Sequence, residues 1–214
     1  MTGLRRIGVL ISACLLLFAA GCGKKTTTGA AVPEEPKVAV SCIAVLPVTT
    51  AVDYEGTVSF ADAKKLRDGV QIMESRLRQE LAGREDIRFV GEGQIYGMKE
   101  TIPEDFLSRA RVIADHLSCN AVLETTIWRY SDRIGGRYTA EEPASVAFEY
   151  RLVEVESGTV LCRGKFDEVQ KSVMENLYNF KTSRMRGFTW VTAEELLSEG
   201  VKEKFDECSY LAQE

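Results

Sequence analysis

The sequence predicts one α/β domain built on a mixed sheet, with helices flanking the sheet and a helical extension at the C-terminus. Two strand patterns alternate with two amphipathic helix patterns and lead into a third strand, which is typical of parallel strands joined by helices. Two further strand patterns follow without a helix, and a short turn joins them, which is typical of an antiparallel hairpin. The predicted order is β-α-β-α-β-β-β over residues 38–166, followed by the extension 167–214.

The first three elements are a strand, a helix and a second strand. Residues 38–48 form the first strand, and the continuous apolar run at 43–46 indicates burial on both faces. Residues 62–82 form the first helix, because apolar residues recur at steps of three and four and make one stripe. A short strand follows at 87–90. The stripe consists of Leu66, Val70, Met73, Leu77 and Leu81.

The glycine-rich stretch 91–97 is predicted to be a turn that binds no cofactor. Its spacing, G-x-G-x-x-x-G, is one residue too long for a dinucleotide-binding turn, and no helix pattern begins there. The second helix begins after this stretch, where Thr101 and Glu104 have the spacing of a capping box. The only histidine, His116, lies near the end of this helix. A cation there suits the helix dipole, and this explains His116 more simply than catalysis does.

The last three strands follow one another. Residues 121–130 form the third strand, and the polar stretch 131–143 is predicted to be a turn. The fourth strand, 144–155, alternates apolar and polar residues, so we expect it to be covered on one face only. A turn at 156–158 leads into the fifth strand at 159–166.

The C-terminal extension is predicted to pack on the domain. Residues 167–190 have no regular pattern, but their dense apolar side chains indicate that they cover a face of the core. Thr192 and Glu195 form a second capping box, which begins a helix that ends near Cys208.

The predicted sheet order indicates which cysteines can form a disulfide. Right-handed crossovers place the first strand between the second and the third, with the hairpin beyond the third. Cys42 and Cys119 then lie at the amino ends of adjacent parallel strands, and they are the preferred disulfide pair in an exported protein. The alternative is that Cys42, Cys119, Cys162 and Cys208 are all buried free thiols.

Residues 1–21 have the three parts of an export signal. Arg5 and Arg6 precede an apolar run at 7–20, and small residues then lead to Cys22. The run is too short to cross a bilayer as a helix, which needs roughly 20 apolar residues.

The sequence Ala-Ala-Gly-Cys at 19–22 resembles the lipobox of bacterial lipoproteins. The resemblance implies cleavage before Cys22, acylation of the new amine and a diacylglycerol on the Cys22 thiol. Gly23 follows instead of the aspartate that favours inner-membrane retention in enteric bacteria. The resemblance therefore implies an anchor in the outer membrane, with the domain facing the periplasm. Ala19 departs from the usual leucine, and the alternative is an ordinary secretory signal cut near Ala20 that leaves Cys22 a plain thiol.

Residues 22–37 are small and polar with two prolines, and they are predicted to be a flexible tether between the lipid and the domain.

The net charge of the chain limits the class of partner. The formal net charge of −5 becomes −7 when the signal removes Arg5 and Arg6. An acidic chain argues against a nucleic-acid partner, because phosphates require clustered lysine and arginine.

Three features are similar to those of a group of envelope lipoproteins: the motif IAVLPV at 43–48, the helix at 62–82, and the strand entry Ala-Val-Leu at 121–123. The group includes the curli-secretion lipoprotein, the outer-membrane activators of penicillin-binding proteins and the amino-terminal domain of the Tol system's β-propeller protein. The resemblance covers roughly residues 38–166. It implies an α/β domain that serves an envelope machine.

The sequence therefore favours a non-catalytic envelope lipoprotein that binds a periplasmic or envelope protein in an assembly, secretion or cell-wall accessory role. It contains no G-x-S-x-G, H-E-x-x-H or P-loop motif, and we expect no metal and no cofactor other than the lipid on Cys22. Tryptophan, tyrosine and arginine are favoured at binding hot spots, so we expect the partner to contact exposed loops rich in them. These candidate contacts are Trp128, Arg129, Tyr130, Arg133, Arg137, Tyr138, Arg184, Arg186, Phe188 and Trp190.

Two alternatives stay open. The chain could be a self-assembling structural or secretion component that forms homo-oligomers through a sheet edge or helix faces. It could also be a hydrolase acting on glycans, because carboxylates are abundant and two of them can cleave a glycosidic bond.

Overall fold

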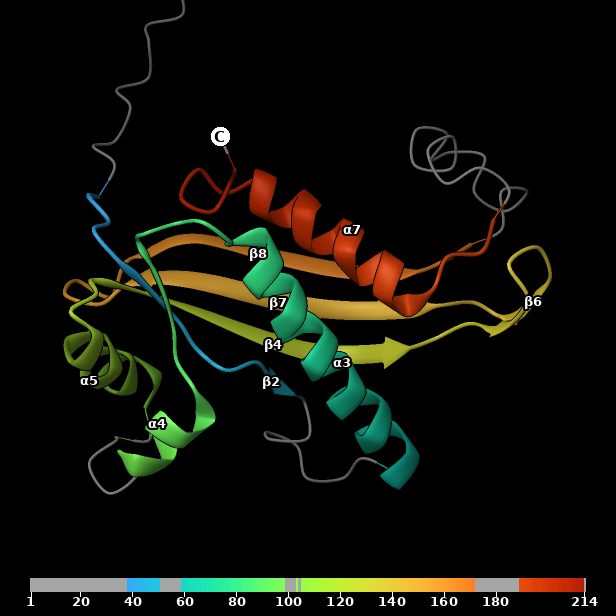
Figure 1. Cartoon of the computed structure of the whole chain (residues 1–214), viewed down its shortest axis with the longest axis horizontal. Helices are drawn as coiled ribbons and strands as arrows, with labels where there is room; N and C mark the ends of the chain where they lie inside the picture. Colours follow the sequence, from blue (N-terminus) through green and yellow to red (C-terminus); the bar gives the residue numbers. More distant parts are fainter. Residues whose placement is uncertain (1–37, 51–58, 99–102, 104, 172–188, 214) are drawn as a thin grey trace, which may run out of the picture. The chain divides into compact units, whose positions relative to one another are not determined.

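The computed structural model describes residues 38–50, 59–98, 103, 105–171 and 189–213 (Figure 1). These residues form a mixed sheet flanked by helices, with a further helix near the C-terminus, and this confirms the predicted fold class. The strands of the main sheet are β1 Ile43–Val45, β2 Thr49–Thr50, β3 Ile87–Phe89, β4 Ala121–Ser131, β7 Ser145–Glu154 and β8 Val160–Val169.

The strand order is β3-β1-β4-β7-β8, as predicted from right-handed crossovers. β1 pairs in parallel with both β3 and β4, and β7 pairs antiparallel with β4 and β8. The first strand is shorter than the predicted 38–48, because β1 ends at Val45, before Pro47. β2 lies just beyond the predicted strand and pairs separately with Thr126 and Ile127 of β4. β8 continues three residues beyond the predicted end of its strand.

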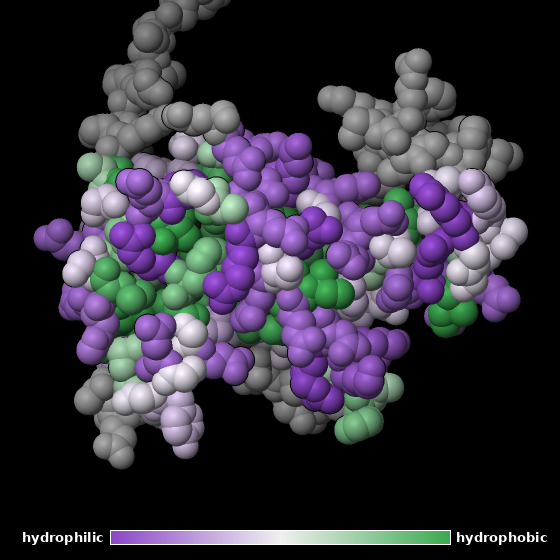
Figure 2. Space-filling model, in the orientation of Figure 1, coloured by the Kyte–Doolittle hydropathy of each residue, from purple (hydrophilic) through white to green (hydrophobic). Residues whose placement is uncertain are grey.

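Helices α3, Phe60–Glu80, and α7, Ala193–Asp206, cover one face of the sheet (Figure 1). Hydrophilic residues dominate their outward surfaces in Figure 2. The N-cap of α7 is Thr192 in the predicted capping box with Glu195. The largest fully buried side chains of this face are Phe148, Phe205, Ile43, Met73, Leu77, Leu81, Leu123, Ile127, Leu152, Leu196 and Leu197.

Helices α4, Glu92–Gly97, and α5, Phe106–Leu117, cover part of the other face. Ala44 and Val122 face these helices, while their strand neighbours Ile43 and Leu123 face α3 and α7. The first strand is therefore buried on both faces, as its apolar run predicted. In the described part of the chain, α5 packs on β1 and β4 and leaves the far end of this face uncovered.

Three local predictions were wrong. The stretch 91–97 forms the short helix α4, because Ile95 and Met98 pack on the apolar cluster under α5. The N-cap of α5 is Asp105, whose carboxylate accepts from the Ser108 N–H, so the predicted capping box of Thr101 does not begin this helix. The polar stretch 131–143 contains a small hairpin, β5 Ile134–Gly135 and β6 Ala140–Glu142.

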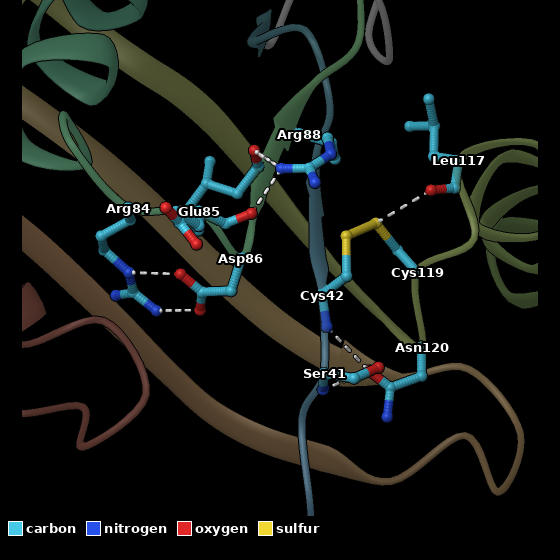
Figure 3. The surroundings of a disulfide bond; sticks show 10 residues. Ser41, Cys42, Arg84, Glu85, Asp86, Arg88, Leu117, Cys119 and Asn120 are labelled. Carbon is cyan, nitrogen blue, oxygen red and sulfur yellow. Dashed lines mark hydrogen bonds and ion pairs between the residues drawn. A yellow bond between two sulfur atoms is a disulfide. The ribbon is translucent and has the colours of Figure 1, made fainter.

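Cys42 and Cys119 form a disulfide in the structure, with their Cα atoms 4.4 Å apart at the amino ends of β1 and β4 (Figure 3). This is the pair preferred from the sheet order. The Asn120 side chain beside it accepts hydrogen bonds from the N–H groups of Ser41 and Cys42. The first residues of the domain are therefore held both covalently and by hydrogen bonds.

A second disulfide joins Cys162 on β8 to Cys208, which follows α7. It ties the C-terminal segment to the edge of the sheet, where the Tyr150 hydroxyl also donates to the Lys204 carbonyl. No helix among the described residues is both long and apolar enough to cross a membrane.

Candidate binding surface on the open face of the sheet

One face of β4, β7 and β8 carries polar and charged side chains where the opposite face is apolar. On β7, Phe148, Tyr150 and Leu152 enter the core, and the residues between them point the other way. We call this surface the open face. Its polar and aromatic members are Glu124, Thr126, Trp128, Arg129, Glu149, Arg151, Arg163, Lys165 and Asp167.

A β-bulge decides which side chains of β4 reach the open face. Ile127 pairs with Phe148 but Arg129 pairs with Ala147, so Trp128 is the extra residue. Trp128 therefore stays on the same face as Thr126. Arg129 reaches this face as well, because its guanidinium donates to the Ser145 hydroxyl and the Asp167 carboxylate.

Glu124 is the buried acid of the open face. Its side chain is 8% exposed, and Oε2 accepts from the Arg151 Nε at 2.6 Å. Arg109, on α5, lies 3.6 Å from the other carboxylate oxygen. The Arg151 guanidinium also lies over the Phe106 ring, 3.7 Å from its centroid. These contacts fix one arginine beside the groove and satisfy the buried carboxylate.

The groove between these side chains has a volume of about 620 Å³. It is open to solvent, and its wall combines a half-exposed tryptophan with carboxylates, arginines and a lysine. Arg163 and Lys165 are exposed, and neither makes an ion pair with any residue that the structure describes. The lining residues are Glu124, Thr126, Trp128, Glu149, Tyr150, Arg151, Arg163, Gly164 and Lys165.

The structure separates the predicted contact residues. Trp128, 39% exposed, and Arg129 belong to the open face. Tyr130 was predicted on an exposed loop, and this was wrong, because it is 9% exposed and packs on the opposite face against Gly69 of α3. Burial is the main reason that the pKa of Tyr130 is raised to about 12, and the nearby charge of Asp132 acts in the same direction.

A second group lies beside the β5–β6 hairpin. The Trp190 N–H donates to the Arg137 carbonyl at 2.7 Å, and the Arg133 guanidinium donates to the Trp190 carbonyl at 3.1 Å. Tyr138 is 75% exposed. The Arg133 guanidinium and the backbone of Trp190 thus hold the hairpin in place. The remaining predicted site residues, Arg184, Arg186, Phe188 and the predicted lipidation site Cys22, lie outside the described residues.

Sequence analysis missed most of the open face. Glu149 and Arg151 carried a signal, because they are the polar positions of the strand expected to be covered on one face. Arg163 and Lys165 have the same alternation on β8. Glu124 is a single carboxylate in an apolar strand entry, and only the structure shows the two arginines that surround it.

The side chains of the open face are suited to binding another molecule. His116 lies elsewhere, in a pocket of about 240 Å³ between α4 and α5 that is lined mostly by apolar residues. Among the described residues, no three His, Cys, Asp or Glu side chains gather in a way that could hold a metal ion. The open face instead offers an aromatic ring, guanidinium groups and carboxylates on a rigid sheet, which is the chemistry of a binding surface.

Comparison with solved structures finds similar chains at low identity. The chain of the PelC dodecamer from Paraburkholderia phytofirmans has a TM-score of 0.44 and 14% identity, with 84% of this chain and 94% of that chain covered. The C-terminal domain of LpoB from Salmonella enterica has a TM-score of 0.36 and 18% identity over 62% and 86%. Lipoprotein GNA1162 from Neisseria meningitidis has a TM-score of 0.37 and 15% identity over 68% and 96%. No family model and no curated protein sequence matches the chain.

Proposed function

We propose that this chain is a non-catalytic lipoprotein of the bacterial cell envelope that binds a protein partner through the open face. Cys22 carries the lipid, residues 22–37 form the tether, and the α/β domain faces the periplasm from the outer membrane. The observation that carries the proposal is the face of β4, β7 and β8 that no described helix covers, where Trp128 and charged groups line one groove.

Two further observations support it. The side chains of this face are set by strand register and by the Glu124–Arg151 contact, so little conformational entropy is lost when a partner docks. The domain begins at a segment that Asn120 and the Cys42–Cys119 disulfide hold in place. The point at which the proposed tether joins the domain is therefore attached directly to the sheet.

Site-specific photo-crosslinking in intact cells tests the partner. The full chain carries a photoreactive amino acid at Val169, an exposed residue of β8 beside the open face, or at Gln71, an exposed residue of α3. We expect Val169 to capture an envelope protein that Gln71 does not. Trp128→Ala should reduce the yield at Val169 about tenfold, as for an aromatic hot spot worth more than about 1 kcal/mol. Equal capture at both positions contradicts the proposal.

Labelling with palmitate tests the anchor. The unmodified chain should incorporate the label and sediment with outer membranes, because two or more acyl chains bind a bilayer stably. Cys22→Ala should lose both properties. A Cys22→Ala chain that stays equally membrane-bound contradicts the lipid anchor but leaves the partner surface open to its own test.

The second candidate function is self-assembly. It is favoured by the position of β8, a ten-residue strand that ends the sheet and pairs only with β7 within the described residues. Light scattering on the detergent-solubilised full chain separates the two: a ring or other closed oligomer supports assembly, and a monomer supports a different protein as partner.

A further inference from the structure

We infer that the partner presents a short acidic segment to the open face, and that its carboxylates pair with Arg163 and Lys165. This inference rests on the proposed function and names the chemistry of the partner at the same surface.

The open face is locally basic on an acidic protein. Five basic side chains lie on it or at its border, and three carboxylates accompany them, whereas the whole chain has a formal net charge of −5. The basic groups are Arg109, Arg129, Arg151, Arg163 and Lys165, and the carboxylates are Glu124, Glu149 and Asp167. A positive region of this kind attracts negative charge and suppresses binding of basic partners.

Two of the three carboxylates on the open face are already paired with arginines, so they do not neutralise Arg163 and Lys165. Glu124 is occupied by Arg151, with Arg109 close to its second oxygen. Asp167 is occupied by Arg129. Only Glu149 remains, and it makes no ion pair with any residue that the structure describes, although it is paired in register with Lys165.

Strand register also places two guanidinium groups opposite each other. Arg151 of β7 pairs with Arg163 of β8, and like charges directly across a sheet are destabilising. Glu124 relieves this repulsion only from the β4 side. A carboxylate entering from solvent near Arg163 would relieve it from the other side, and it would form a charge-assisted hydrogen bond with an exposed guanidinium.

The size of the patch selects a short segment of protein. Arg163 and Lys165 alone are too few to hold a polyphosphate, and the acidic remainder of the chain repels an extended polyanion or an anionic membrane. Trp128, which is 39% exposed, adds an apolar surface beside these charged groups. An acidic peptide segment with an apolar side chain beside its carboxylates satisfies all of these features.

Charge-removing variants test the inference in the full chain with the photoreactive group at Val169. Arg163→Gln with Lys165→Gln removes the two cations that would receive the acidic segment. The matched control, Arg67→Gln with Lys202→Gln, removes one exposed arginine and one exposed lysine from α3 and α7, which cover the other face. A third variant, Arg163→Lys with Lys165→Arg, keeps both charges. Thermal melting of each variant checks that the fold is intact.

We expect the crosslinking yield of the Arg163→Gln, Lys165→Gln variant to fall about tenfold, which corresponds to the loss of two ion pairs of ordinary strength. The control and the charge-keeping variant should retain the yield, and mass spectrometry should place the crosslink beside aspartate or glutamate residues of the partner. Capture of a protein whose yield does not change in the first variant, or falls equally in the control, overturns the acidic segment and leaves the proposed function standing. Failure of the unmodified chain to capture any protein overturns both.

Discussion

Glu124 of β4 and Arg151 of β7 face each other across the sheet, and the arginine Nε donates to the carboxylate over 2.6 Å. The two partners differ in exposure, because the Glu124 side chain is 8% exposed and the Arg151 side chain is 45% exposed. The carboxylate is therefore the member that depends on the pair. Water can solvate Arg151 alone, but it reaches Glu124 poorly.

Arg151→Met should lower the free energy of unfolding by about 1–3 kcal/mol, because it leaves the buried Glu124 with the more distant Arg109 as its only cation among the described residues. Urea denaturation at pH 7 measures the loss. The control is Lys64→Met, which breaks the exposed Lys64–Asp68 pair of α3 and should cost less than about 0.5 kcal/mol. Adding Glu124→Gln to Arg151→Met should recover part of the loss. Equal costs for Arg151→Met and Lys64→Met would mean that the contact is not stabilising.

Gly69→Ala should destabilise the fold by about 1–2 kcal/mol, although alanine is the better helix former. A Cβ at position 69 would lie 2.7 Å from the Tyr130 ring, so α3 and β4 would have to move apart. The control is Gly93→Ala in α4, where a Cβ meets no atom within 4 Å. That substitution should stabilise by up to about 1 kcal/mol. Thermal melting compares the two variants, and a Gly69→Ala protein as stable as Gly93→Ala would contradict the close packing.

The strand order and the covered and uncovered faces of β7 could be predicted from the sequence. Both follow from local periodicity and from the handedness of crossovers, which do not depend on distant contacts. The alternation from Val146 to Leu152 is sufficient by itself to place Glu149 and Arg151 on an uncovered face. That part of the candidate surface is therefore visible in the residue pattern.

The rest of the surface depends on features that have no pattern of their own. The bulge at Trp128 changes the alternation of β4, so Trp128 and Arg129 share the open face while Tyr130 returns to the core. Tyr130 is then covered because Gly69 lets α3 approach closely. Sequence analysis treated all three aromatic and basic residues as one exposed loop, since a bulge has no fixed side-chain signature. The link from Cys162 to Cys208 likewise depends on where α7 docks.

Alkylation should find no free thiol among Cys42, Cys119, Cys162 and Cys208 in the purified full chain. Iodoacetamide should label these four only after reduction, with mass mapping in the pairs seen in the structure. Replacing either pair by serine should lower the free energy of unfolding by about 2–4 kcal/mol, because each bond closes a long loop. The sequence separations are 77 and 46 residues. Four labelled thiols without reductant would contradict both bonds.

Glu154 gives a pH-dependent prediction at the turn between β7 and β8. Its carboxylate accepts from the Ser157 hydroxyl at 2.5 Å and from the N–H groups of Ser157 and Glu156 at 2.7 and 2.8 Å. The Ser157 hydroxyl is the main reason that the pKa of Glu154 lies below its ordinary value of 4.5, and the two N–H groups lower it further. Because the folded pKa is the lower one, this carboxylate stabilises the fold above pH 4.5, and the stabilisation is lost as pH falls through the folded pKa.

Glu154→Gln should therefore lower the free energy of unfolding by about 1–3 kcal/mol at pH 7. The amide has only one acceptor oxygen, and it is uncharged, whereas the carboxylate accepts from three donors. The difference from the unmodified chain should shrink steadily as pH falls below 4.5. Denaturant unfolding at about pH 7, 5, 4 and 3 measures this difference in the free energy of unfolding. Glu156→Gln, which changes an exposed carboxylate in the same turn, should show little difference at any pH. A cost for Glu154→Gln that is constant from neutral to acid pH would show that side-chain size, and not ionisation, stabilises the turn.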